Sequence, residues 1–358
     1  FLSFSSCHAQ PDISLGGKIH PDPNWKPIIY LIQPRHWNEI AGDFLGQVVD
    51  SAAIAQDGAF SFKPFTPDSE RTLFILAIQR KGNRFPNHLT DEDPAMANYM
   101  PLIVKKGEHL KIKTALPDFQ KTFQVEPLSV ENTTILNLRD IRIDAFEKFL
   151  APAHSGEEDD SLLLEKEKAQ MNFATPLMQF ADTTRCLEAA LLASRWISPT
   201  GDYERMPEFI TGQCRKWEKL KPGHAMVNEL CAAANTEKLP LLIGDPFPDF
   251  SMPLNTGDSV RISNMLGKKL TLIDLWASWC APCRKENLTI LVPLWQSYKS
   301  DGLQIIGYSL DANAAAWKNA IAKDGTSWIQ ASHLRGDDSP FMDELHLTTI
   351  PANFILDA

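Results

Sequence analysis

Two cysteines separated by two residues are the strongest chemical signal in the sequence. Cys280 and Cys283 lie in the run Trp-Ala-Ser-Trp-Cys-Ala-Pro-Cys, which ends at residue 283. A Cys-x-x-Cys pair between a strand and a helix places both sulfurs at the positive end of the helix dipole, where free backbone N–H groups favour a thiolate. Such a setting lowers the thiol pKa from about 8.5 to roughly 3.5–7.5. The pair therefore predicts thiol–disulfide exchange.

The order of the two cysteines predicts their roles. Cys280 precedes the helix, so we expect it to face outward, attack the disulfide of a partner and form a mixed disulfide. Cys283 lies one turn into the helix and is expected to resolve that intermediate. Pro282 suits a first helical turn, whose N–H groups have no intrahelical partner. The alternatives are an inert pair or half of a zinc site. The sequence has no second Cys-x-x-Cys motif and no close His pair, so no metal or other cofactor is predicted.

The elements around the pair alternate between strand and helix. The pattern predicts a strand at 270–276, a helix at 282–298, a strand at 303–309 and a helix at 314–323. A segment rich in chain-breaking residues, 244–250, leads into them. This order implies a parallel or mixed sheet covered by helices. We therefore predict an α/β domain over residues 238–358.

Two regions of different character precede this domain. Residues 11–125 are predicted to form a β-rich domain, a small sandwich of short antiparallel strands. Asp57-Gly58 and Lys106-Gly107 supply turn signals between strand-like runs, and Asp-Gly favours a tight hairpin. In residues 126–237, apolar side chains recur at helical spacing. This second region is predicted to be a helical spacer or interaction module. The strand-like runs of the first are 27–33, 47–55, 59–65, 72–79 and 102–113.

Composition excludes two classes of function. The net charge of −10 and the pI near 5.4 argue against a nucleic-acid partner, which requires clustered Lys and Arg. No apolar run approaches the ~20 residues that a membrane-spanning helix needs. Cys186, Cys214 and Cys231 lie in segments predicted to be helical and are expected to be small buried apolar residues. A disulfide between Cys214 and Cys231 is also possible, since spacing does not determine connectivity.

The first residues are predicted to be a signal remnant or a lipid-attachment tail, residues 1–10. The run that ends at Cys7 resembles a lipoprotein signal, which would leave Cys7 acylated as a lipid anchor. The alternatives are a cut that leaves Gln10 first, or an unmodified N-terminal cysteine. Both processed forms place the mature protein in the periplasm or cell envelope.

The Trp-Cys-Ala-Pro-Cys motif after Ile-Asp-Leu-Trp resembles the TlpA/ResA-like branch of thioredoxin-fold thiol-disulfide oxidoreductases, which is related to the AhpC/TSA group. The resemblance covers residues 239–358. It extends to the segment 244–250, to Tyr308-Ser309-Leu310-Asp311 and to Ile350-Pro351. It implies a thioredoxin-like domain behind a β-sandwich-like domain and a helical region. A complete thioredoxin fold adds another strand and a terminal helix, so we expect a domain truncated at its C-terminus.

The resemblance also assigns roles to further residues. Pro351 matches the cis-proline that faces the active-site cysteines, and Ile350 offers backbone groups to a substrate strand, with Trp279 as a further substrate-binding residue. Asp274 matches a buried acid that relays a proton to or from the resolving cysteine. Glu286 matches an active-site glutamate. The alternative for Pro351 is an ordinary trans turn. Asp274 could instead be a structural acid on a strand, and Glu286 an exposed acid on a helix.

One departure concerns the geometry of the active-site helix. Leu288 stands where the family has a helix-kinking proline, and Pro293 is a candidate for a displaced bend.

The implied function is an envelope thiol-disulfide oxidoreductase that reduces disulfides of secreted proteins, with apocytochrome c among the candidate substrates. It would draw electrons from a membrane-embedded dithiol donor. The Ala-Pro pair between the cysteines resembles the reducing members of the family. Three alternatives stay open: an envelope-anchored binding protein with a vestigial thioredoxin-like domain, a metallochaperone that adds His333 or His346, and a peroxiredoxin-like peroxidase. For a peroxidase, Ala277 and Ile273 stand where a Thr or Ser and a Pro are needed.

Overall fold

The protein divides into two compact units. The computed structural model describes residues 13–66, 69–154 and 163–357, so Cys7 and the predicted tail 1–10 lie outside the described residues. The first unit holds residues 1–155 and 169–234, and the second holds residues 156–168 and 235–358. Within the described ranges, no helix has the length and apolar character needed to cross a bilayer.

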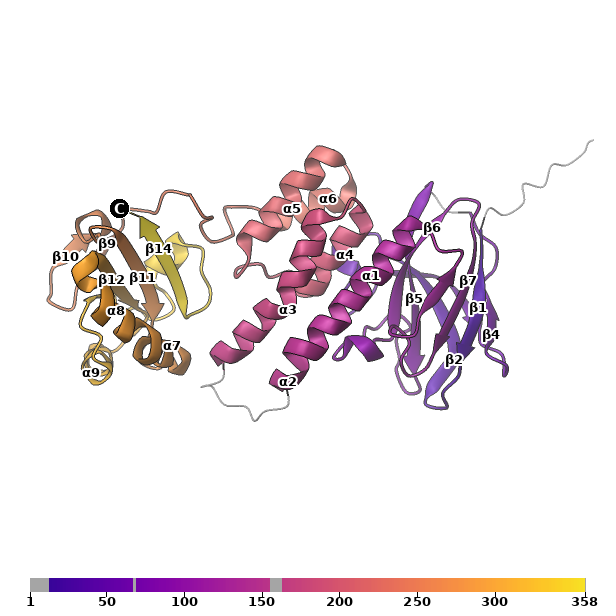
Figure 1. The fold of residues 1–358 in the computed structure, drawn as a ribbon, viewed down its shortest axis with the longest axis horizontal. Coiled ribbons are helices and arrows are strands. Elements are labelled where there is room, and N and C mark those ends of the chain that lie inside the picture. Colours follow the sequence, from indigo (N-terminus) through magenta and orange to yellow (C-terminus); the bar gives the residue numbers. More distant parts are fainter. Residues whose placement is uncertain (1–12, 67–68, 155–162, 358) are drawn as a thin grey trace, which may run out of the picture. The chain divides into compact units, whose positions relative to one another are not determined.

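The first unit contains two four-stranded sheets (Figure 1). One has the order β4-β1-β7-β8 and the other β3-β2-β5-β6. The β-rich prediction for this region is confirmed, although β1 and β7 run parallel rather than antiparallel. The strands are β1 (Ser14–His20), β2 (Trp25–Gln33), β3 (Gln47–Ala53), β4 (Ala59–Ser61), β5 (Arg71–Arg80), β6 (Tyr99–Lys105), β7 (His109–Ala115) and β8 (Gln124–Glu126).

The two predicted turns connect different sheets rather than paired strands. Gly58 and Gly107 have φ angles of +83° and +79°, the left-handed region that favours glycine. A tight backbone turn does form at Gly58, whose N–H donates to the carbonyl of Ala55 at 2.9 Å. However, β3 and β4 then enter separate sheets, as do β6 and β7. The N–H of Ala55 also donates to the Ala59 carbonyl at 2.9 Å, so the predicted tight hairpin turn forms at Asp57-Gly58, although the strands that flank it belong to different sheets.

The helices that follow these strands share a compact unit with them. Asn132 joins the two, because its side chain accepts from the N–H of Ile103 at 2.9 Å and donates to the Ile103 carbonyl at 2.8 Å. The boundary near residue 126 therefore separates strands from helices inside one unit. The helices are α1 (Val130–Ala145), a π-helical segment η3 (Phe146–Leu150), α2 (Ala151–His154), α3 (Leu163–Thr183), α4 (Leu187–Ile197), α5 (Pro207–Leu220) and α6 (Ala225–Ala233).

Cys214 and Cys231 form a disulfide that joins α5 to α6. The expectation of buried apolar cysteines was therefore wrong for this pair, because their Cα atoms lie 4.9 Å apart in the folded chain. Cys186 remains a free, buried cysteine, as predicted. Burial and the nearby carboxylate of Glu188 raise the pKa of the Cys186 thiol to about 11.

Replacing both Cys214 and Cys231 with alanine is expected to lower the unfolding free energy of the first unit by about 3 kcal/mol. The reason is the loop entropy that a bridge across 17 residues removes from the unfolded chain. Denaturant unfolding at 25 °C, followed by hydrogen exchange of α5 and α6, measures the change. Dithiothreitol should destabilise these helices in the wild type but not in the double variant. Equal stability of the two proteins would contradict the prediction.

The second unit is an α/β domain built on a four-stranded sheet of order β13-β12-β11-β14 (Figure 1). β11 pairs parallel with β12 and antiparallel with β14. The predicted strands 270–276 and 303–309 are confirmed residue for residue. The strands are β9 (Ser251–Pro253), β10 (Ser259–Arg261), β11 (Leu270–Trp276), β12 (Leu303–Ser309), β13 (Ile329–Ala331) and β14 (Ala352–Asp357). The helices are α7 (Ala281–Glu286), α8 (Val292–Tyr298), α9 (Ala314–Asp324) and α10 (Pro340–Glu344).

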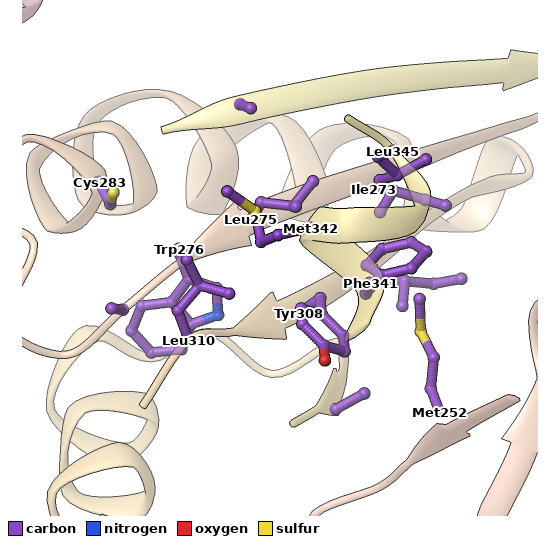
Figure 2. Packing of buried hydrophobic residues seen from close by; sticks show 14 of the residues in the cluster. Met252, Ile273, Leu275, Trp276, Cys283, Tyr308, Leu310, Phe341, Met342 and Leu345 are labelled. Carbon is purple, nitrogen blue, oxygen red and sulfur yellow. The ribbon is translucent and has the colours of Figure 1, made fainter. Parts of the chain in front are cut away.

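Alternating residues of β11 face two different layers of core. Ile273 and Leu275 pack with Phe341 and Met342 of α10, as Figure 2 shows. On the other face, Leu272 packs in a cluster with Leu291, Ile305 and Trp328, against which Trp295 of α8 lies. Since side chains alternate along a strand, Asp274 shares the second face with Leu272. This face is the one that the helix after the cysteines covers.

The helix after the cysteines is irregular without a proline at position 288. A π-helical segment η6 (Asn287–Leu291) lies between α7 and α8, and Pro293 stands in the first turn of α8. One extra residue per turn changes the direction of the helix face, and such segments are frequent at functional sites. The irregularity begins directly after Glu286, the last residue of α7.

Candidate active site

Cys280 and Cys283 are joined by a disulfide at the start of α7. Cys280 is the N-cap residue of the helix, and the N–H of Cys283 donates to Sγ of Cys280 at 3.2 Å. An orphan N–H group of a helix N-terminus therefore points at this sulfur and would stabilise negative charge on it. The predicted position at the strand-to-helix junction is confirmed by β11 and α7 on either side.

The two sulfur-bearing residues differ little in exposure in the disulfide form. Cys280 is 5% exposed and Cys283 1%, whereas the preceding Trp279 is 61% exposed. The expectation that Cys280 faces outward is therefore wrong for the disulfide form, in which both cysteines are buried. What separates the two residues is position: Cys280 caps the helix, while Cys283 lies inside its first turn.

The loop that carries Cys280 is held from two sides by polar side chains. Asp311 accepts from the N–H of Ser278 at 2.8 Å and from its hydroxyl at 2.5 Å. Arg284 donates to the Ser278 carbonyl at 3.1 Å and forms an ion pair with Asp324. Asp311 is buried, so these bonds are strong constraints on the backbone before Trp279. Sequence reasoning matched Asp311 to a family motif but gave it, and Arg284, no role.

Asp274 is a buried acid on β11, beneath α7. It is 1% exposed, and its Oδ2 atom has no hydrogen-bond partner among the described residues. Desolvation by burial, with a further contribution from the charge of Glu286, raises the pKa of Asp274 well above 3.8. A carboxyl group in this state is neutral at low pH and becomes a relatively strong base once it ionises. The strand position of this acid suits the proton relay that the resemblance implied.

Glu286 lies at the end of α7 and is held by a strand residue. The side-chain amide of Asn353 donates to Oε1 of Glu286 at 2.8 Å. Asn353 belongs to β14 and pairs directly with Asp274 of β11. The structure therefore brings Glu286 and Asp274 to the same face of the sheet. Sequence reasoning missed Asn353, because nothing in the sequence indicates which residue of the last strand pairs with Asp274.

The Ile350–Pro351 peptide bond is cis, and Pro351 is buried. Ala352, the next residue, pairs with Leu275 at the carboxyl end of β11. Pro351 thus lies at the edge of the sheet from which the loop to Cys280 departs. The structure brings these two segments, which are far apart in the sequence, to one edge, while Trp279 projects into solvent.

The histidines considered for a metallochaperone have other partners. Nδ1 of His333 is 2.6 Å from the Tyr308 hydroxyl, and Nδ1 of His346 is 3.1 Å from the Leu239 carbonyl. Among the described residues, the group with metal-ligand spacing is Cys214, Glu218 and Cys231, whose two sulfurs are already joined. Neither histidine is therefore placed as a ligand beside Cys280.

Comparisons with known proteins agree on the second unit. Residues 242–357 match the Redoxin family, a segment that contains every predicted site residue except Cys7. The thiol:disulfide interchange protein DsbE of Pseudomonas fluorescens biotype C is 31% identical over 124 residues, 33% of this chain and 62% of that protein. The thiol-disulfide oxidoreductase ResA of Bacillus thuringiensis (strain Al Hakam) is 30% identical over 89 residues, 25% of this chain and 50% of that protein.

A solved thiol-disulfide oxidoreductase from Bacteroides fragilis NCTC 9343 is 33% identical. The match covers 31% of this chain and 81% of that chain, with a TM-score of 0.29. The chain spans between half and two thirds of the length of the two curated relatives named above. All of these matches cover at most about a third of this chain.

Proposed function

Because residues 242–357 form a Redoxin domain with a thioredoxin-like fold, we propose that this protein is a thiol-disulfide oxidoreductase of the cell envelope. It reduces disulfides of secreted proteins, with apocytochrome c as one candidate. The observation that carries the proposal is the N–H of Cys283 directed at Sγ of Cys280. This contact stabilises the thiolate form, which is the form that attacks disulfides.

Reduction takes two exchange steps. The Cys280 thiolate attacks one sulfur of the partner's disulfide, the partner's S–S bond breaks, and its other sulfur leaves as a thiolate that takes a proton. Cys283 then gives its proton to the carboxylate of Asp274 and attacks Sγ of Cys280. The mixed disulfide breaks, and the partner's second sulfur leaves and is protonated. The protein is left with the Cys280–Cys283 disulfide, the form seen in the structure.

A further cycle requires two electrons and two protons from a reduced dithiol, which we propose to be membrane-embedded. Trp279, Ile350 and Pro351 are proposed to contact the partner beside the cysteines. The exposure of Trp279 and the position of Pro351 at the same sheet edge support this assignment. Cys7 is proposed as the site of a lipid anchor.

Replacing Cys283 with alanine is expected to trap partners on Cys280 as stable mixed disulfides, because the resolving thiol is gone. The variant is expressed in the cell envelope, free thiols are blocked with acid and alkylating agent, and covalent adducts are identified by mass spectrometry. The matched control is the double variant Cys280→Ala, Cys283→Ala, which should capture nothing. If the single variant captured no more than this control, and the wild type reduced no model disulfide, the binding-protein alternative would replace this proposal.

A further inference from the structure

The pairing of β11 with β14 places one uncharged polar residue beside the buried acid. Asn353 stands directly opposite Asp274 in the antiparallel pair. Paired residues of neighbouring antiparallel strands have Cβ atoms about 4.5–5.5 Å apart and point to the same face of the sheet. The other strand neighbour of Asp274 is Gly307 of β12, which has no side chain. Asn353 is thus the one side chain that a directly paired strand residue presents next to Asp274.

Asn353 also reaches the active-site helix. Its side-chain nitrogen donates to Oε1 of Glu286 at 2.8 Å, across 67 residues of sequence. Glu286 is the last residue of α7, where the regular helix gives way to the π-helical segment η6. A long side chain at such a junction has many rotamers, and fixing one of them requires a specific partner. The amide of Asn353 supplies one such partner from β14.

We propose that Asn353 is a positioning residue for the resolution step: its amide holds the carboxylate of Glu286 close to the carboxyl group of Asp274. This inference rests on the proposed function. A fixed negative charge on Glu286 keeps Asp274 protonated to higher pH, so that its carboxylate is a stronger base for the proton of Cys283 when it does ionise.

The two cations on α7, Arg284 and Lys285, do not have the role proposed for Glu286. Arg284 is paired with Asp324 of α9, and Lys285 precedes Glu286 on the same helix. Burial is the largest cause of the raised pKa of Asp274, and the charge of Glu286 is the second. Cys283 in the first turn of α7 and Cys280, which caps this helix, are neutral while they are joined as a disulfide.

Asn353→Leu tests the inference through the pH profile of one step. The reduced protein is mixed in a stopped-flow instrument with an excess of a symmetric chromogenic aromatic disulfide from pH 5 to pH 9. Attack by Cys280 releases one aromatic thiol and leaves the other in the mixed disulfide, and release of this second thiol by Cys283 is the step followed. The rate should rise with pH as Asp274 ionises. In Asn353→Leu the midpoint should move to lower pH by about one unit, because the charge of Glu286 is no longer held nearby.

Two further variants separate positioning from a general effect on the strand. Glu286→Gln should shift the midpoint in the same direction, and Asn353→Leu added to Glu286→Gln should shift it no further. Ile355→Ala, which removes an exposed side chain from β14, should leave the midpoint in place. A midpoint in Asn353→Leu that stayed within about 0.2 pH units of the wild-type midpoint would overturn the inference. So would an additive shift in the double variant.

The two levels of failure are distinguishable in this experiment. If the wild type forms the mixed disulfide and resolves it, but Asn353→Leu behaves like the wild type, only the role of Asn353 is lost. If the wild type releases no thiol from Cys280 at any pH, the proposed function itself fails.

Discussion

Replacing Cys280 with serine is expected to lower the rate of reduction of a model disulfide by about 10³-fold or more, the order of loss when an enzyme is deprived of its nucleophile. A serine hydroxyl does not ionise near neutral pH, so the N–H of Cys283 would have no thiolate to stabilise. The measurement is the initial rate of insulin or small-molecule disulfide reduction, with dithiothreitol as electron donor and its uncatalysed rate subtracted.

Cys186→Ser is the matched control for this prediction, because it makes the same chemical change at the free cysteine. Burial and Glu188 raise the pKa of Cys186 to about 11, so only about 10⁻⁴ of this thiol is ionised at pH 7. Its replacement should leave the rate unchanged. Alkylation of the reduced protein at pH 7 should label Cys280 far faster than Cys186. Equal labelling rates for the two thiols would contradict the role assigned to Cys280.

Asp274→Asn is expected to slow resolution of the mixed disulfide by about 10²-fold or more, the typical contribution of a positioned acid or base. The amide cannot take the proton of Cys283, although it occupies the same space on β11. The initial attack by Cys280 should change little, so the mixed disulfide should accumulate in the variant. Single-turnover measurements separate the two steps. A variant that resolved as fast as the wild type would remove Asp274 from the mechanism.

The same substitution should change how stability depends on pH. The pKa of Asp274 in the folded protein lies well above 3.8, its value when exposed. The window runs from pH 3.8 up to the higher pKa that Asp274 has in the folded protein. Within it the folded state binds more protons than the unfolded state, so the wild type loses stability as the pH rises. Each pH unit of the window is worth about 1.4 kcal/mol. Asparagine does not titrate, so the stability of Asp274→Asn relative to the wild type should increase from pH 4 to pH 8.

Denaturant unfolding of the second unit at several pH values checks this expectation. The slope of the difference with pH is the informative quantity, because the fixed cost of burying an amide without partners does not vary with pH. A difference that stayed constant from pH 4 to pH 8 would show that Asp274 ionises in the folded protein as an exposed acid does.

Local signals were enough to predict the elements that carry the cysteines. β11 and β12 have the bounds predicted from the apolar runs 270–276 and 303–309. The prediction succeeded because buried parallel strands consist of short, nearly continuous apolar stretches. The motif around Cys280 and Cys283 predicted the strand-to-helix junction, which β11 and α7 confirm. The predicted cis-proline is present at Ile350–Pro351. Each of these features depends on residues that are neighbours in the sequence.

Contacts between distant segments were decided only by the tertiary structure. The Cys214–Cys231 bridge depends on how α5 and α6 pack, and the partner of Asp274 depends on the register of β14 against β11. A one-residue change of that register would turn Asn353 to the opposite face, away from Glu286. Composition and residue spacing do not predict the register of β14 against β11, because that register follows from the packing of the whole sheet. The sequence by itself therefore predicted the two sulfurs of the Cys-x-x-Cys pair and their place before a helix, while the fold decided which side chains lie near Asp274.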